Sequence, residues 1–307
     1  MRPGDILLYN DIKAKLSTYK TIRPLPGINS PQNENCFILQ IIDSVRRIRY
    51  VRLMSENTVD VVTTNPSSVA FDPLKAAVWH RNQGDINEAF WLTFLATHFG
   101  KNLRTKWNLV KDVYSGLTNN IVWSWDNVCL NPNEFLIWLN DSQDVLKSRG
   151  RVGNHRKYQS LGAYNSNGTG SAIMSYINWI GQNHNHQDLI NITLKAAGND
   201  SKKGFRHLYN SMDEVISFGR MAKFDFLTMI GKLNLIDIEP DSTYMIGATG
   251  PVKGAKILFG QNVSNSTFEE WFTELEEHLD LDFGMQVLED AVCNWQKQPA
   301  NYIHFRG

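Results

Sequence analysis

The sequence has few of the residues and patterns that mark several large classes of protein. It contains three cysteines, Cys36, Cys129 and Cys293, and none of them belongs to a C-x-x-C pair. A zinc site or a disulfide scaffold is therefore not expected, and a reducing, cytoplasmic setting fits best. No stretch approaches the roughly 20 apolar residues that a membrane helix requires, and the N-terminus lacks the apolar core of a signal peptide. We expect no metal ion and no contact with a membrane.

An excess of charge of one sign is also missing. Lys and Arg number 31, and Asp and Glu also number 31, so the net charge is zero. This disfavours a protein held to nucleic acid by bulk charge alone, but it is compatible with a local basic groove. No Walker loop, nucleophile elbow or kinase motif is present. The glycine-rich stretch 247–255 does not follow a strand, which disfavours a dinucleotide fold. We expect no cofactor.

The order of predicted elements indicates a mostly α fold. Residues up to about 70 contain three short β-like runs, 37–42, 48–53 and 58–64, and form either a small β-rich subdomain or an N-terminal arm. From Asp72 onward the pattern is helical, beginning with an Asp-Pro helix start. Residues 85–88 resemble a capping box. The sequence thus predicts an N-terminal segment, 1–70, with short strands and a helical domain, 71–307.

The C-terminal third contains a helical apolar pattern, 218–233, followed by a glycine turn and a second helix. Gly247 and Gly250 lie in that turn, and Lys253 and Lys256 follow them. Such a turn offers backbone N–H groups at a helix N-terminus, which suits one DNA phosphate. Helix, glycine-rich hairpin, helix and then a carboxylate is the order used by helix-hairpin-helix DNA glycosylases. The alternative interpretation is a flexible interhelical loop.

Two aspartates are candidates for the chemistry of such an enzyme. Cleavage of a glycosidic bond builds positive charge on the sugar, which an ionised carboxylate stabilises, and a carboxylate can also orient the attacking water. Asp290 follows the hairpin at the expected start of an apolar helix. Asp225 precedes it, between Phe224 and Phe226, where an unpaired charge would be costly. The simpler alternatives are a helix cap for Asp290 and a salt bridge with Arg220 for Asp225.

Two polar segments add further candidates. A basic loop without acidic residues, 149–160, is suited to contact phosphates or to wedge into a base step. The residues proposed for DNA contact there are Asn154, His155, Arg156, Lys157 and Tyr158. An aromatic and polar segment is suited to enclose a flipped base. Its proposed pocket residues are Trp79, His80, Arg81, Asn87, Glu88 and Trp91. The alternatives are a solvated loop for the first segment, and core and capping roles for the second.

Several long blocks resemble the α-glutamyl/putrescinyl thymine pyrophosphorylase family, and within it the third clade. These blocks are residues 72–81, 87–101, 153–161, 218–225, 247–251 and 284–297, in this order. The family is regarded as part of the DNA glycosylase-like superfamily, and its members are linked to hypermodified bases in phage DNA. Its name implies a thymine pyrophosphate intermediate. Bacterial relatives look like defence glycosylases that remove modified bases, including glucosylated hydroxymethylcytosine, from phage genomes.

This resemblance implies a DNA N-glycosylase that flips and excises a hypermodified base from double-stranded phage DNA, with no obligate protein partner. One departure concerns the hairpin, because the stretch from Gly250 to Ala255 is one residue longer than usual. Lys253 is therefore not carried over as a Schiff-base lysine, and we expect a monofunctional enzyme that leaves an abasic site. The alternatives are a transferase or pyrophosphorylase that installs an amine on activated thymine, and a non-catalytic module that binds modified DNA.

Overall fold

The computed structural model describes residues 3–118, 121–153 and 159–304. These residues are mostly α-helical, as the sequence predicts, and their only β pairing is two isolated bridges, Asn102 with Lys106 and Ser160 with Gly168. The chain divides into two compact units. We call residues 1–51 together with 240–307 the terminal unit, and residues 52–239 the central unit. The sequence analysis predicted a domain boundary near residue 70. The division into these two units does not test that boundary, which stays a prediction.

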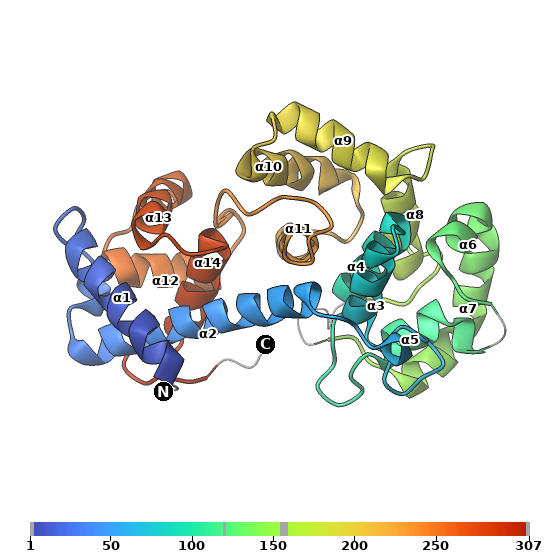
Figure 1. The fold of residues 1–307 in the computed structure, drawn as a ribbon, viewed down its shortest axis with the longest axis horizontal. Helices are drawn as coiled ribbons and strands as arrows, with labels where there is room; N and C mark the ends of the chain where they lie inside the picture. The colour runs from blue at the N-terminus through green and yellow to red at the C-terminus, as the bar shows by residue number, and fades with distance from the viewer. Residues whose placement is uncertain (1–2, 119–120, 154–158, 305–307) are drawn as a thin grey trace. The chain divides into compact units, whose positions relative to one another are not determined.

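The terminal unit combines helices from both ends of the chain (Figure 1). Its helices are α1 (Pro3–Tyr19), most of α2 (Pro31–Glu56), α12 (Gly250–Phe259), α13 (Asn265–Leu279) and α14 (Gly284–Trp295). They share one core of buried side chains, among them Phe37, Phe268, Leu288 and Trp295. The first and last parts of the sequence therefore fold around the same apolar centre.

The short strands expected in residues 37–53 were a wrong prediction. Both runs lie inside the single helix α2, which begins at Pro31 and ends at Glu56. Its buried apolar side chains are Phe37, Ile38, Ile41, Ile42, Val45 and Ile48. These positions recur with the period of a helix, and this period outweighs the β preference of the Ile and Val residues. The third run, 58–64, contains a 3-10 turn at Val61–Thr63.

Helix α12 packs directly on α14 through two glycines. A Cβ added at Gly254 would lie 2.3 Å from the carbonyl oxygen of Val292, and one added at Gly250 would lie 2.9 Å from Cys293 Sγ. No side chain fits against a backbone oxygen at 2.3 Å, so glycine at position 254 sets the spacing of the two helices.

The substitution Gly254→Ala is expected to destabilise the protein by about 1–3 kcal/mol, because the new methyl group forces α12 away from α14. Denaturant unfolding, followed by tryptophan fluorescence, measures the change. Gly4→Ala in α1 is the matched control, since among the described residues nothing lies within 4 Å of its added Cβ. Equal midpoints for both variants would show that the α12–α14 contact tolerates the methyl group.

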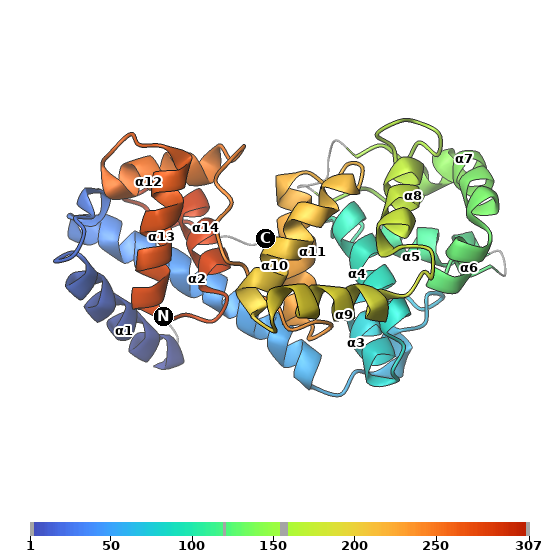
Figure 2. The same cartoon turned by 90° about the horizontal axis from the view of Figure 1, so that it is seen from above.

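The central unit is built from the remaining helices, seen from a second direction in Figure 2. They are α3 (Pro73–Asn82), α4 (Ile86–Phe99), α5 (Asn108–Tyr114), α6 (Trp125–Leu130), α7 (Pro132–Arg149), α8 (Thr169–Ile180), α9 (His186–Ala197), α10 (Ser201–Ser211) and α11 (Arg220–Lys232). Buried α4 lies at the centre, where Phe94 stacks on Tyr176 with ring centroids 3.9 Å apart. Among the described residues, no helix has the length and apolar character needed to cross a membrane.

Two helix starts of the central unit were correctly predicted from local signals. Asp72 caps α3 by accepting hydrogen bonds from the N–H groups of Leu74 and Lys75, and Pro73 occupies the first turn. Asp85 caps α4 by accepting from the N–H of Glu88 at 3.1 Å. The carboxylate of Glu88, however, accepts the N–H of Trp125 at 2.7 Å. Asp85 thus supplies its half of the expected capping box, whereas its own N–H donates to the carbonyl of His80 and Glu88 instead joins α4 to the start of α6.

Candidate active site around Asp290

Asp290 lies within α14, well after the helix begins at Gly284. The expectation that it stands at a helix start, and the alternative that it is a helix cap, were therefore both wrong. The apolar face of α14 is buried through Val287, Leu288 and Ala291. Asp290 lies beside this face with a quarter of its side chain exposed, so solvent can reach a carboxylate that rests on a rigid element.

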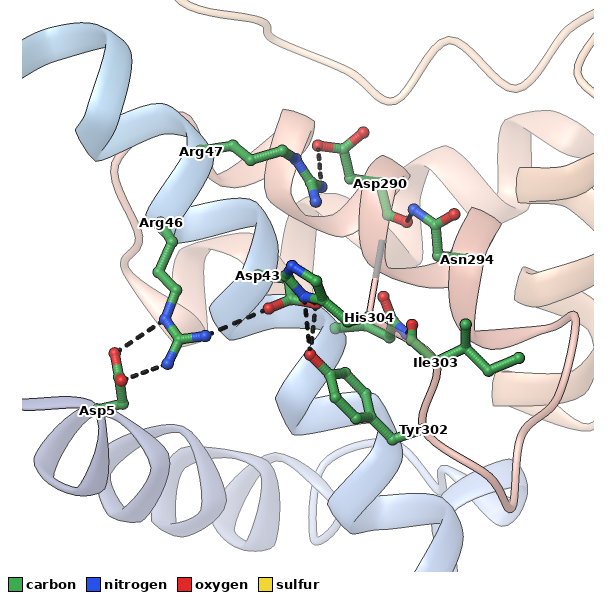
Figure 3. Close-up of polar contacts among 10 residues, drawn as sticks. Asp5, Asp43, Arg46, Arg47, Asp290, Asn294, Tyr302, Ile303 and His304 are labelled. Atoms are coloured by element: carbon green, nitrogen blue, oxygen red, sulfur yellow. Dashed lines mark hydrogen bonds and ion pairs between the residues drawn. The ribbon is translucent and has the colours of Figure 1, made fainter. Parts of the chain in front are cut away.

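Two side chains of α2 hold the Asp290 carboxylate, and Figure 3 shows one of them, Arg47. Ser44 Oγ donates to Asp290 Oδ2 at 2.7 Å, and Arg47 donates from its terminal NH2 to the same oxygen at 3.1 Å. Ser44 and Arg47 are three residues apart and therefore share one face of the helix. A hydroxyl donor and a guanidinium both stabilise negative charge on the carboxylate. The arrangement fixes an anion at a partly exposed position.

A second carboxylate, Asp43, is buried next to this pair. Its side chain is 1% exposed, and its Oδ2 accepts from Tyr302 Oη at 2.7 Å and from His304 Nδ1 at 2.9 Å. Arg46 lies 3.4 Å from the other oxygen and also forms an ion pair with Asp5 of α1. Burial, followed by the hydrogen bond to Asp43, raises the pKa of the Tyr302 phenol well above its ordinary value. Tyr302 therefore remains a donor to Asp43.

The loop that leads into α12 is held by one glutamate of α13. Glu269 Oε2 accepts from Ser242 Oγ at 2.6 Å, from the N–H of Thr243 at 3.0 Å and from Thr243 Oγ1 at 2.8 Å. Its other oxygen accepts the N–H of Met245. Four donors on one carboxylate order the backbone just before the glycine turn. The sequence analysis missed Glu269, which no local pattern distinguishes from the other acids of its helix.

The four hairpin candidates lie at the turn and in the helix that follows it. Gly247 has φ +77°, a left-handed conformation that favours glycine. Gly250 is the first residue of α12, and Lys253 and Lys256 are exposed on that helix. Among the described residues, Thr249 at the N-cap makes no side-chain capping hydrogen bond. The connection from α11 to α12 spans residues 233–249.

The other sequence candidates fall in the central unit or outside the described residues. Asp225 is partly buried on α11 between buried Phe224 and Phe226, as its neighbours in the sequence suggested. Its catalytic role, and its pairing with Arg220, stay predictions. The proposed DNA contacts Asn154, His155, Arg156, Lys157 and Tyr158 lie outside the described residues.

Most of the proposed base-pocket residues make contacts within the central unit. Trp91 is fully buried and donates from Nε1 to the carbonyl of Trp123 at 2.8 Å. Asn87 Oδ1 accepts the N–H of His186 at 2.9 Å, and Arg81 donates to the carbonyl of Ser55 at 2.7 Å.

Near the surface of the same unit, His80 Nδ1 lies 3.0 Å from Asp85, and half-buried Trp79 contacts the His80 ring edge-on. These contacts are of the core and capping kind that the sequence analysis weighed as the alternative. A role in a base pocket stays a prediction.

Glu88 is buried, with 5% of its surface exposed, and this burial raises its pKa from 4.5 to about 7. In the unfolded chain the carboxyl has its ordinary pKa, so between pH 4.5 and 7 the native state binds a proton that the unfolded state lacks. The contribution of Glu88 to the free energy of unfolding is therefore largest below about pH 4.5. It falls by up to about 3 kcal/mol as the pH rises through about 7.

Glu88→Gln is expected to remove this loss, because the neutral amide oxygen still accepts the N–H of Trp125. The variant should be more stable than the parent at about pH 8 and similar to it at about pH 5. Urea unfolding at both pH values measures the difference, with Glu134→Gln, an exposed position of α7, as the control. An unchanged pH slope in Glu88→Gln would assign the loss to another group.

The residues of α2, α14 and the C-terminal tail lie within one family match. A family model described as alpha-glutamyl/putrescinyl thymine pyrophosphorylase clade 3 matches residues 32–307. The chain belongs to this family. The match confirms the resemblance and extends it from residue 72 back to residue 32, so that it includes Asp43, Ser44 and Arg47. Comparisons with curated proteins and with solved structures gave no match.

The family's name is that of a pyrophosphorylase, which is an enzyme, and it connects the chain with modified thymine. Among the described residues, no group of three or more His, Cys, Asp or Glu side chains is arranged to hold a metal ion.

Proposed function

We propose that this protein is a monofunctional DNA N-glycosylase that flips and excises a hypermodified base from phage DNA and leaves an abasic site, in antiviral defence. The observation that carries the proposal is the Asp290 carboxylate, held by Ser44 and Arg47 at a partly exposed position. When the C1′–N bond breaks, positive charge develops on the sugar, and a fixed anion beside C1′ lowers the barrier. A neutral or freely moving group would supply less of this stabilisation.

The start of α12 supports the DNA-binding part of the proposal. Helix α12 packs on α14, which carries Asp290, and its glycine-rich N-terminus is preceded by the loop that Glu269 orders. Backbone N–H groups at such a terminus suit a phosphate, and exposed Lys253 and Lys256 add positive charge. Under this proposal, residues 154–158 are further candidates for contacts to DNA. The Trp79–Trp91 segment is a further candidate for contacts to the flipped base.

The test is incubation of the purified protein with unmodified, hydroxymethylcytosine-containing and glucosylated phage DNA. Abasic sites are scored by alkali-induced strand breaks. We expect breaks in at least one modified DNA and none in the unmodified control. Intact DNA in all three would contradict the proposal, and binding without breaks would then favour a module that recognises modified DNA.

The family's name favours a second candidate function, a transferase that installs an amine on an activated thymine in DNA. In that reaction an amine attacks the exocyclic methylene carbon of a pyrophosphorylated thymine in DNA, a C–N bond forms, the C–O bond breaks and pyrophosphate leaves. The test is incubation of pyrophosphorylated DNA with and without an added amine. A change in the mass of the DNA that depends on the amine, with release of pyrophosphate, would establish the transferase function in place of the glycosylase function.

A further inference from the structure

A buried carboxylate orients a solvent-exposed imidazole at the C-terminal end of the terminal unit. Asp43 is 1% exposed, whereas the side chain of His304, whose Nδ1 contacts Asp43 Oδ2 at 2.9 Å, is 56% exposed. A carboxylate at Nδ1 fixes the tautomer that carries the proton there and stabilises the imidazolium once it forms. The other nitrogen, Nε2, is then the one available to accept a proton.

The tail that carries His304 is fixed on α2 by two further contacts. Gln40, which is 4% exposed, donates from Nε2 to the carbonyl of Ile303 at 2.8 Å. Tyr302 donates to the same carboxylate oxygen of Asp43 that contacts His304. Asp43, Gln40 and Tyr302 thus fix the tail and the exposed imidazole on α2, which is the support that a functional side chain needs to keep its geometry.

Helix α2 brings this imidazole and Asp290 to one part of the molecule. Asp43 contacts His304, and the next residue, Ser44, contacts Asp290. One turn later, Arg46 pairs with Asp43 and Arg47 pairs with Asp290. Figure 3 draws both groups beside this stretch of α2. A single turn of one helix therefore positions an anion and an oriented imidazole.

We propose that His304 is the general base that activates the attacking water, and that Asp43 is its positioning residue. This rests on the proposed glycosylase function. The C1′–N bond breaks, and its electron pair leaves with the base. The oxygen of water bonds to C1′ while Nε2 of His304 takes the proton of that water, which then passes to the released base. Asp290 remains ionised and stabilises the sugar cation.

Asp43 Oδ2 and Tyr302 Oη contact Nδ1 of the imidazole, at 2.9 and 3.2 Å. Arg46 pairs with Asp43 and with Asp5 of α1, and Arg47 pairs with Asp290 of α14. Asp43 is the group that contacts the ring directly with a full negative charge. Its neutralisation is therefore the change that most directly weakens the imidazolium.

The test measures single-turnover base excision against pH for the wild type, His304→Ala and Asp43→Asn. His304→Ala is expected to lower the rate about 100-fold without weakening DNA binding, and to remove the rate increase between about pH 5 and 8. Added imidazole should restore part of the rate. Asp43→Asn should lower the rate by a smaller factor than His304→Ala and should keep a pH-dependent rate. His207→Ala, at an exposed position of α10, is the control and should behave as wild type.

The outcomes separate this inference from the proposed function. Excision by the wild type and an equal rate and pH profile for His304→Ala would overturn the role of His304 alone. A lower rate with an unchanged pH profile and no response to imidazole would assign His304 a structural role and also overturn it. No excision by the wild type on any modified DNA would overturn the proposed function, and the inference with it.

Discussion

Asp290→Asn is expected to lower base excision about 100- to 1,000-fold while leaving DNA binding within a few-fold of wild type. The amide keeps the size of the side chain and still accepts from Ser44 and Arg47, so α14 keeps its place. It removes the negative charge, and a group that stabilises developing charge in a catalytic site is typically worth about 100- to 1,000-fold in rate. The loss should appear in the single-turnover rate rather than in the affinity.

The matched control is Glu289→Gln, the neighbouring acid on the same helix. It points in a different direction on α14 and should retain activity. Full activity of Asp290→Asn would remove Asp290 from the mechanism and move the role to Asp225 or Glu289, which the activities of Asp225→Asn and Glu289→Gln would decide.

The second large effect is expected from Arg47→Gln. Arg47 contacts Asp290 Oδ2 at 3.1 Å, and a hydrogen bond between charged groups is worth about 1.5–3 kcal/mol. Loss of this contact leaves the carboxylate less firmly held, with Ser44 still donating to the same oxygen, and should lower excision about 10- to 100-fold. Arg49→Gln, at an exposed position of the same helix, is the control for the loss of one positive charge near DNA and should leave the single-turnover rate unchanged.

A double-mutant cycle isolates the contact between Arg47 and Asp290. If Arg47 acts through Asp290, Arg47→Gln should have little further effect on the residual rate of Asp290→Asn. Equal losses in both backgrounds would show that Arg47 acts independently, for example by binding a phosphate.

The parts of the fold that depend on local signals could be predicted from the sequence. The starts of α3 and α4 were identified because Asp72 and Asp85 cap through hydrogen bonds to residues two or three positions away. The strands expected within α2 were wrong because the β preference of Ile and Val was given more weight than their helical spacing. In α2 the helical spacing decides, since it places the apolar side chains in one core.

The candidate site could be predicted only in part. Asp290 was named, but its partners Ser44 and Arg47 lie more than 240 residues earlier in the chain, and no spacing within the sequence connects them. The same holds for Asp43 and His304, which meet because the terminal unit is built from both ends of the chain. The packing of Gly254 on the backbone of α14 likewise joins segments that no local pattern connects.

The measurement that tests the central claim most directly is mass spectrometry of the small molecules released from glucosylated phage DNA by the wild-type protein and by Asp290→Asn. The account predicts a free modified base in the wild-type reaction, in amounts equal to the alkali-labile sites formed, and almost none with Asp290→Asn. Alkali-stable DNA and no free base with the wild type, on this and on the other modified DNAs, would contradict it.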